Sequence, residues 1–164
     1  MSLSWKPPTE GYCKIHVDGG LSRNGEVGAS AAVCRGRDGG YLGSSSIVLP
    51  GLTEPATLGM LVCGEALALA EDLSLTNIII ACDSKTIVDD INEGKGGAYD
   101  AIVKKFNSMA SYFVSCLVIF EGRASNCEAH NLAKHSAMLD QGRHLWLIHP
   151  YDPTCIPINI HIDQ

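Results

Sequence analysis

The sequence carries little positive charge. Its 12 lysines and arginines are outnumbered by 18 aspartates and glutamates, and the formal net charge is −6. A protein that binds nucleic acid through charge alone presents a broad basic surface. The composition therefore argues against that class of protein, although it leaves open a local groove in which metal ions supply the positive charge.

Long apolar runs and paired cysteine motifs are also absent. No stretch approaches the roughly 20 apolar residues that a membrane-spanning helix needs, and the first residues, MSLSWKPPTEG, lack the apolar core of a secretory signal. The seven cysteines are odd in number and have no C-x-x-C spacing, which argues against a structural zinc site. We therefore expect no membrane contact and free thiols in an intracellular, reducing compartment, whether nucleus, cytoplasm or organelle.

The remaining composition is that of an ordinary globular protein. The chain has 164 residues, of which 46% are hydrophobic, so it is long enough to bury the core of about one domain. We expect a lead-in segment over residues 1–11, the domain over 12–140, and a C-terminal extension over 141–164 that packs on it. We also expect a monomer.

The spacing of apolar residues predicts a mixed α/β fold. The predicted strands span residues 12–20, 25–36, 40–49, 77–83 and 111–122. The predicted helices span residues 53–73, 84–92, 98–110 and 126–139. The order of these elements favours a five-stranded sheet, with three antiparallel strands and then two parallel ones, flanked by helices. The proline-rich tail from residue 145 onward is expected to pack as extended chain or loops.

One glutamate stands inside an apolar helical stripe. In LVCGEALALAED (61–72), Glu65 lies three residues after Val62 and four before Leu69. A buried carboxylate without a partner costs roughly several kcal/mol. Glu65 therefore needs a partner or a metal ion, unless the helix is rotated enough to bring it to solvent.

Two aspartates are expected where a ligand would bind. Asp18 and Asp83 end the first and fourth predicted strands, which are neighbours in this topology. Ligands in such sheets bind at the crevice where the strand order changes direction. We expect Glu65 to face both aspartates across a divalent cation, because oxygen ligands select Mg²⁺ or Mn²⁺. A turn at Asp18 and a helix cap near Asp83 are the ordinary structural alternatives.

Four motifs together resemble a known family. VDGG, GEALALAEDL, ACDSKTIVDDI and NCEAHNLAK occur in the order found in type 1 ribonuclease H, and they most resemble its plant reverse-transcriptase-like branch. The resemblance runs from about Trp5 to the tail and implies a ribonuclease H-like fold. It also implies that two metal ions, held by Asp18, Glu65 and Asp83, hydrolyse the RNA strand of RNA–DNA hybrids, which are read through the minor groove.

The resemblance breaks at a fourth carboxylate. Its place in NCEAHNLAK is taken by His130, which we count among the catalytic positions. Mg²⁺ prefers oxygen and binds nitrogen poorly. We therefore expect a weaker second metal, reduced activity and a preference for Mn²⁺.

Five further residues are candidate substrate contacts: Gly19, Gly20, Ser84, Arg123 and Asn126. Arg123 lies in the loop EGRASN, where the flexible histidine of the family is missing, and an ordinary solvated loop residue is the alternative. Asn126 has helix capping as its alternative.

Three functions stay open at this point. The first is the hybrid nuclease that the resemblance implies, and the second is a binding or adaptor module that has lost efficient catalysis. The acidic net charge and His130 favour the module, whereas the three acids favour the nuclease. A nuclease that acts on duplex RNA or DNA is the third possibility, because fold alone does not decide the substrate.

Overall fold

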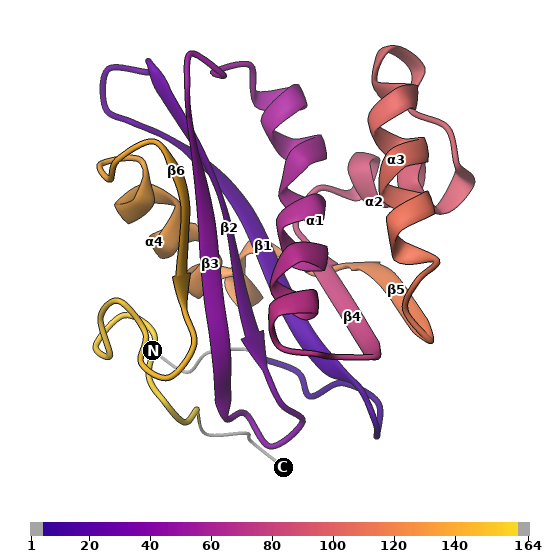
Figure 1. The fold of residues 1–164 in the computed structure, drawn as a ribbon, viewed down its shortest axis with the longest axis vertical. Coiled ribbons are helices and arrows are strands. Elements are labelled where there is room, and N and C mark those ends of the chain that lie inside the picture. The colour runs from indigo at the N-terminus through magenta and orange to yellow at the C-terminus, as the bar shows by residue number, and fades with distance from the viewer. Residues whose placement is uncertain (1–4, 161–164) are drawn as a thin grey trace.

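The protein is built around one mixed sheet whose strands lie in the order β5-β4-β1-β2-β3-β6 (Figure 1). The computed structural model describes residues 5–160. The strands are β1 (Cys13–Leu21), β2 (Val27–Arg35), β3 (Tyr41–Pro50), β4 (Asn77–Cys82), β5 (Ser115–Phe120) and β6 (Gly142–Trp146). The α-helices are α1 (Pro55–Asp72), α2 (Lys85–Glu93), α3 (Asp100–Ala110) and α4 (Cys127–Ser136), and the 3₁₀ turns are η1 (Gly97–Tyr99) and η2 (Arg123–Ser125).

The connections fix the strand directions. Short turns join β1, β2 and β3, which therefore pair antiparallel. The chain then crosses through α1 and returns, so that β4 runs parallel to β1, and β5 follows parallel to β4. The nearly unbroken apolar run of β4 is buried, as expected for a central parallel strand.

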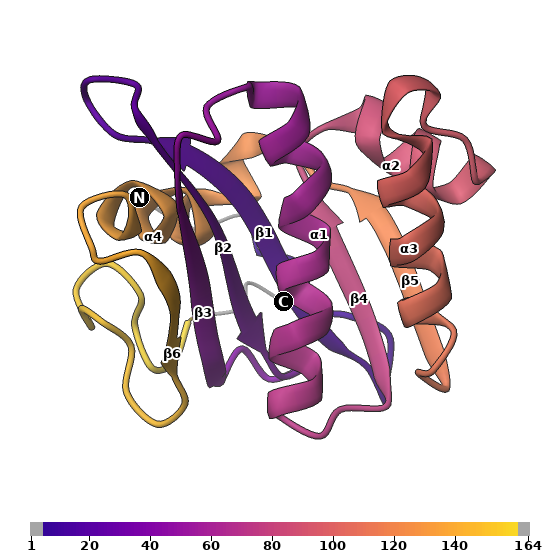
Figure 2. The same ribbon diagram turned by 45° about the horizontal axis from the view of Figure 1, so that its top comes forward.

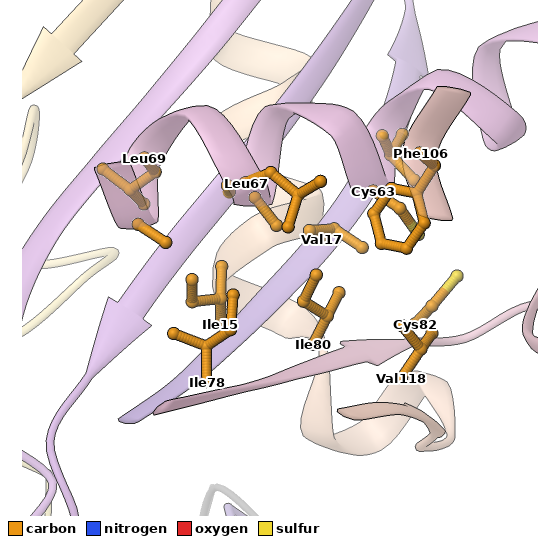
Figure 3. Packing of buried hydrophobic residues seen from close by; sticks show 14 of the residues in the cluster. Ile15, Val17, Cys63, Leu67, Leu69, Ile78, Ile80, Cys82, Phe106 and Val118 are labelled. Atoms are coloured by element: carbon orange, nitrogen blue, oxygen red, sulfur yellow. The ribbon is translucent and has the colours of Figure 1, made fainter. Parts of the chain in front are cut away.

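Helices cover the two faces of the sheet separately. Helix α1 lies across one face, and α4 lies on the opposite face (Figure 2). Alternate residues of β1, Ile15 and Val17, join Leu67 of α1 in the larger apolar cluster (Figure 3). On the other face, Ala31 and Val33 of β2 pack with the smaller cluster that α4 contributes.

The sequence-based prediction of five strands is wrong by one. Residues 142–146, within the region expected to be an extension, form β6, which pairs antiparallel with the edge of β3. Two ion pairs of Arg143, to Glu65 and to Asp72, fasten this strand to α1. The proline-rich remainder of the extension follows β6 without regular strands up to residue 160.

The domain boundaries, the oligomeric state and the absence of membrane contact were also predicted from the sequence. Residues 1–4 of the lead-in and 161–164 of the extension lie outside the described residues, and the division at residues 11 and 140 stays a prediction. The monomer also stays a prediction. Within residues 5–160, none of the helices has the length and apolar character needed to cross a membrane.

Candidate active site

Asp18 lies inside β1 and points to the face that α4 covers. The expectation that it ends the strand is wrong, because β1 continues for three residues to Leu21. Its Oδ2 lies 2.9 Å from Nδ1 of His130 in α4, and its Oδ1 accepts a hydrogen bond from the backbone N–H of Gly19 at 2.9 Å. Asp18 is thus held from two sides, with 14% of its side chain exposed.

Asp83 follows the last residue of β4. Because Cys82 pairs with Val17 in the parallel ladder, the end of β4 lies beside Asp18. Burial raises the pKa of Asp18, and the negative charge of Asp83 raises it further, against the opposing effects of His130 and the Gly19 N–H. The two aspartates therefore lie close together, as expected from the sequence, and their negative charges repel each other.

Glu65 does not join them, so the expectation that it faces Asp18 and Asp83 is wrong. Its Oε1 accepts hydrogen bonds from Ser45 Oγ of β3 at 2.7 Å and from Arg143 Nε of β6 at 2.8 Å. The residue is 6% exposed. The partner that a buried carboxylate requires is an arginine, and not a metal ion.

The alternation of side chains in the sheet explains this separation. Ser45 is in register with Ala32, and Ala32 with Val17, which packs toward α1. Asp18 is the next residue after Val17, so its side chain points to the opposite face. Glu65 in α1 and Asp18 in β1 are therefore directed to different sides of the sheet.

His130 occupies the position expected from the sequence. It lies in the first turn of α4, with 36% of its side chain exposed beside Asp18. Since it contacts Asp18 directly, it adds a nitrogen group to the site where the resemblance implied a carboxylate. Lys134, one turn later on the same helix, also lines this region. Sequence analysis missed Lys134, although the i, i+4 spacing from His130 was the available signal.

Two glycines predicted to contact substrate lie where the helices come close to β1. A Cβ at Gly19 would meet Leu58 of α1 at 3.0 Å. A Cβ at Gly20 would lie 3.2 Å from the backbone carbonyl carbon of Ala133 in α4. Both glycines also line the pocket beside Asp18, but the close helix contact is what requires them to be small.

The other three predicted substrate contacts lie in different environments. Ser84 caps α2 through a hydrogen bond from the Ile87 N–H, and it also lines the pocket. Arg123 is exposed at the start of η2. Asn126 stands at the N-cap position of α4, but its Nδ2 donates to the Val17 carbonyl at 3.0 Å and it is buried. Asn126 therefore links β1 to α4 and does not cap the helix through its side chain, whereas its contact with substrate stays a prediction.

A pocket of about 670 Å³ opens beside the two aspartates. Its walls come from β1, the first half of α1, α2, Tyr99 of η1, and His130 and Lys134 of α4. The part of α1 that reaches it contributes Leu58, Gly59 and Met60, and so provides no carboxylate. Sequence analysis missed this apolar wall, because the same leucine and methionine positions are also typical of an ordinary helix core.

The donor set limits which metal ions the site suits. Mg²⁺ is commonly held by one or two carboxylates and completes its shell with water and substrate phosphate. Asp18 and Asp83 fit one such cation, since their mutual repulsion favours a positive charge between them. Across residues 5–160, no three histidine, cysteine, aspartate or glutamate side chains gather into a metal site. The residues therefore fit one hard cation and do not fit the pair of metal ions that the resemblance implied.

Comparison with solved structures identifies the fold. The chain is similar to ribonuclease H1 from the archaeon Halobacterium salinarum NRC-1, with a TM-score of 0.63 and 17% identity over 77% of this chain and 97% of that one. It is also similar to the N-terminal ribonuclease H domain of rv2228c from Mycobacterium tuberculosis, with a TM-score of 0.59 and 21% identity over 77% and 93% of the two chains. LC11-RNase H1, isolated from compost by a metagenomic approach and solved in complex with an RNA/DNA hybrid, gives a TM-score of 0.58 and 18% identity over 77% and 99%.

Comparison at the level of sequence identifies the family. No curated protein sequence matches the chain. The profile of the reverse transcriptase-like family matches residues 16–136, which is well over half of the chain and includes Asp18, Asp83 and His130. The ordered motifs and the sheet topology agree with this match. The chain belongs to the reverse transcriptase-like family and has a ribonuclease H fold.

Proposed function

We propose that the protein is a ribonuclease H-type hydrolase that cleaves the RNA strand of RNA–DNA hybrids slowly, with one divalent cation. The observation that carries the proposal is a pair of neighbouring carboxylates: Asp18 lies within β1, and Asp83 follows the end of the adjacent parallel strand β4. The family match and the similarity to a ribonuclease H solved with a hybrid support the choice of substrate.

The two aspartates hold the cation, which is Mg²⁺ or Mn²⁺. When bound, it supplies positive charge to the scissile phosphate and lowers the pKa of an attacking water. His130 keeps Oδ2 of Asp18 in place, while the Gly19 N–H keeps Oδ1 in place. This arrangement fixes the carboxylate before substrate binds, which is the protein's own contribution to positioning.

His130 also limits the rate. Its Nδ1 contacts the same Asp18 oxygen that a cation needs, and when protonated it adds a positive charge beside the cation position. Exposed Lys134, one turn further along α4, supplies a positive charge for a backbone phosphate of the substrate. We therefore expect weak Mg²⁺-supported cleavage and faster cleavage in Mn²⁺, which accepts nitrogen-containing sites more readily.

A second function is favoured by one specific observation. Glu65 is neutralised by Arg143, and His130 replaces a carboxylate, so the site has two acids where the resemblance implied four. A catalytically inactive module that binds RNA–DNA hybrids through the same crevice is consistent with this loss. The two candidates differ in cleavage and not in binding.

The test combines both measurements on one substrate. A hybrid with an end-labelled RNA strand is incubated with the parent protein and with Asp83→Asn, in Mg²⁺ and in Mn²⁺, and its affinity is measured in parallel. Cleavage by the parent that disappears in Asp83→Asn, with binding retained, supports the hydrolase. Binding without cleavage in either cation supports the module. Cleavage that survives in Asp83→Asn excludes this crevice as the active site.

A further inference from the structure

We propose that the pocket beside Asp18 and Asp83 binds an unpaired nucleobase, so that the protein prefers hybrids whose RNA strand carries an unpaired nucleotide next to the cleaved bond. The part of this inference that concerns cleavage rests on the proposed function. The affinity of the pocket for a base is a separate property. The pocket measures about 670 Å³, within the range of small-molecule sites.

The pocket lining combines two kinds of chemistry. Asp18 and Asp83 suit a cation and, through it, a phosphate. Leu58 of α1, which lies against Gly19 next to Asp18, and Ile87 of α2 are apolar. A ligand that fits this lining carries both a phosphate and a flat or apolar group. A nucleotide has this composition.

Tyr99 adds an aromatic ring to the pocket lining. It stands in η1 after the glycine-rich segment GKGG (94–97), and its hydroxyl donates a hydrogen bond to Oε1 of Glu54 at the start of α1. This contact links η1 to the N-cap of α1 and restrains the ring. Aromatic side chains that bind bases by stacking are tolerant of sequence, because every base has a π-face.

A base in a regular duplex is not available to such a pocket. Inserting it requires that the nucleotide leave the stack, which costs least where it is already unpaired or mismatched. The geometry therefore selects a bulge, an end or a junction in the hybrid over a continuous duplex. We expect a fully paired hybrid to contact His130 and Lys134, which line the pocket together with Asp18, without placing a base in it.

The experiment measures the binding of two probes to the full chain in saturating Mg²⁺. Adenosine 5′-monophosphate and ribose 5-phosphate share the sugar and phosphate, so the ratio of their dissociation constants reports the base alone. We expect the nucleotide to bind about tenfold more tightly, as for one stacked base. Equal affinities would overturn the proposal, and this comparison requires no variant to fold.

Three variants locate the effect. Tyr99→Leu removes the ring and should abolish most of the tenfold preference, whereas Tyr99→Phe keeps the ring and should retain it. Tyr112→Leu is the matched control, because Tyr112 is 88% exposed and does not line this pocket. A preference that survives Tyr99→Leu, or one that is lost in Tyr112→Leu, contradicts the assigned site.

The outcome is distinguishable from a failure of the proposed function. If the base preference is present and the parent cleaves no hybrid, the pocket stands and the hydrolase fails. If the parent cleaves a paired hybrid and no base preference is found, the hydrolase stands and the pocket fails. A hybrid with one bulged ribonucleotide should bind more tightly than the paired hybrid, and equal binding of the two contradicts the inferred substrate preference.

Discussion

Arg143 Nε of β6 donates a hydrogen bond of 2.8 Å to Oε1 of Glu65 in α1. The same guanidinium reaches Asp72 through Nη2 at 2.6 Å, so one arginine joins the last strand to two acids of the helix. Since Glu65 is buried and Ser45 also donates to it, the carboxylate is satisfied without a metal ion. Glu65 thus fastens the C-terminal strand to the domain.

Removing Arg143 should therefore destabilise the fold. Arg143→Met leaves Glu65 buried with Ser45 as its remaining donor, and we expect a loss of about 1–3 kcal/mol in the free energy of unfolding. Urea denaturation measures this loss. Lys85→Met, which removes an exposed ion pair to Asp89, is the control and should change stability little. Equal midpoints for Arg143→Met and the parent would contradict a structural role for Glu65.

Gly20 offers a second test, because the sequence predicts a substrate contact there and the structure places it against α4. Gly20→Ala places a Cβ 3.2 Å from the backbone of Ala133, and we expect about 1–3 kcal/mol of destabilisation from overpacking. Gly64→Ala is the matched control in α1, where nothing lies within 4 Å and helix propensity should rise. A Gly20→Ala protein that keeps its stability but loses hybrid affinity would show that Gly20 contacts the substrate.

Glu121 makes the stability depend on acid pH. Burial raises its pKa, but hydrogen bonds with His16 and Lys14 lower it more, to about 2. The pKa in the folded state therefore lies below the ordinary value of 4.5 for a glutamate. Its ionised form stabilises the fold above about pH 4.5, and this contribution is lost as the pH falls toward 2.

Glu121→Gln should flatten that dependence. Urea midpoints at pH 6 and pH 3 should fall less between the two conditions in Glu121→Gln than in the parent. Glu93→Gln serves as the control, since Glu93 is exposed at the end of α2. An unchanged pH dependence in Glu121→Gln would mean that the cluster with Lys14 and His16 contributes nothing to acid sensitivity.

Cation binding should be visible in stability without any activity. We expect Mn²⁺ to raise the melting temperature of the parent, by an amount equivalent to about 2.7 kcal/mol at a concentration 100-fold above its dissociation constant. Asp18→Asn should melt higher than the parent in chelator, because it removes the repulsion with Asp83, and it should no longer respond to Mn²⁺. Asp140→Asn, at an exposed position, should respond as the parent does. A full Mn²⁺ response in Asp18→Asn places the cation elsewhere.

Much of the fold was predictable because the relevant signals are local. The turn between β2 and β3, the isoleucine run of β4 and the Ser84 cap of α2 each depend on a few neighbouring residues. The strand β6 was not predictable in this way. It pairs with an edge nearly 100 residues earlier in the chain, and Arg143, which fastens it, resembles any other polar residue in the sequence.

The two aspartates of the site could be predicted from the sequence, but the partner of Glu65 could not. Asp18 and Asp83 follow from strand order and parallel pairing, which bring the two strands together at one edge. Glu65 requires the rotation of α1 and the face of the sheet that it meets, and both depend on how Val62 and Leu69 pack. A helical stripe marks which residues are buried, but it does not identify the partner of a buried acid.

The most direct measurement is the rate of cleavage of a labelled RNA–DNA hybrid in Mn²⁺ by the parent, Asp18→Asn and His130→Asp. The account predicts slow cleavage by the parent, none by Asp18→Asn, and faster cleavage by His130→Asp, because a carboxylate then replaces the imidazole beside Asp18. No cleavage by the parent or by His130→Asp, with the hybrid still bound, would contradict it and leave a protein that binds hybrids without hydrolysing them.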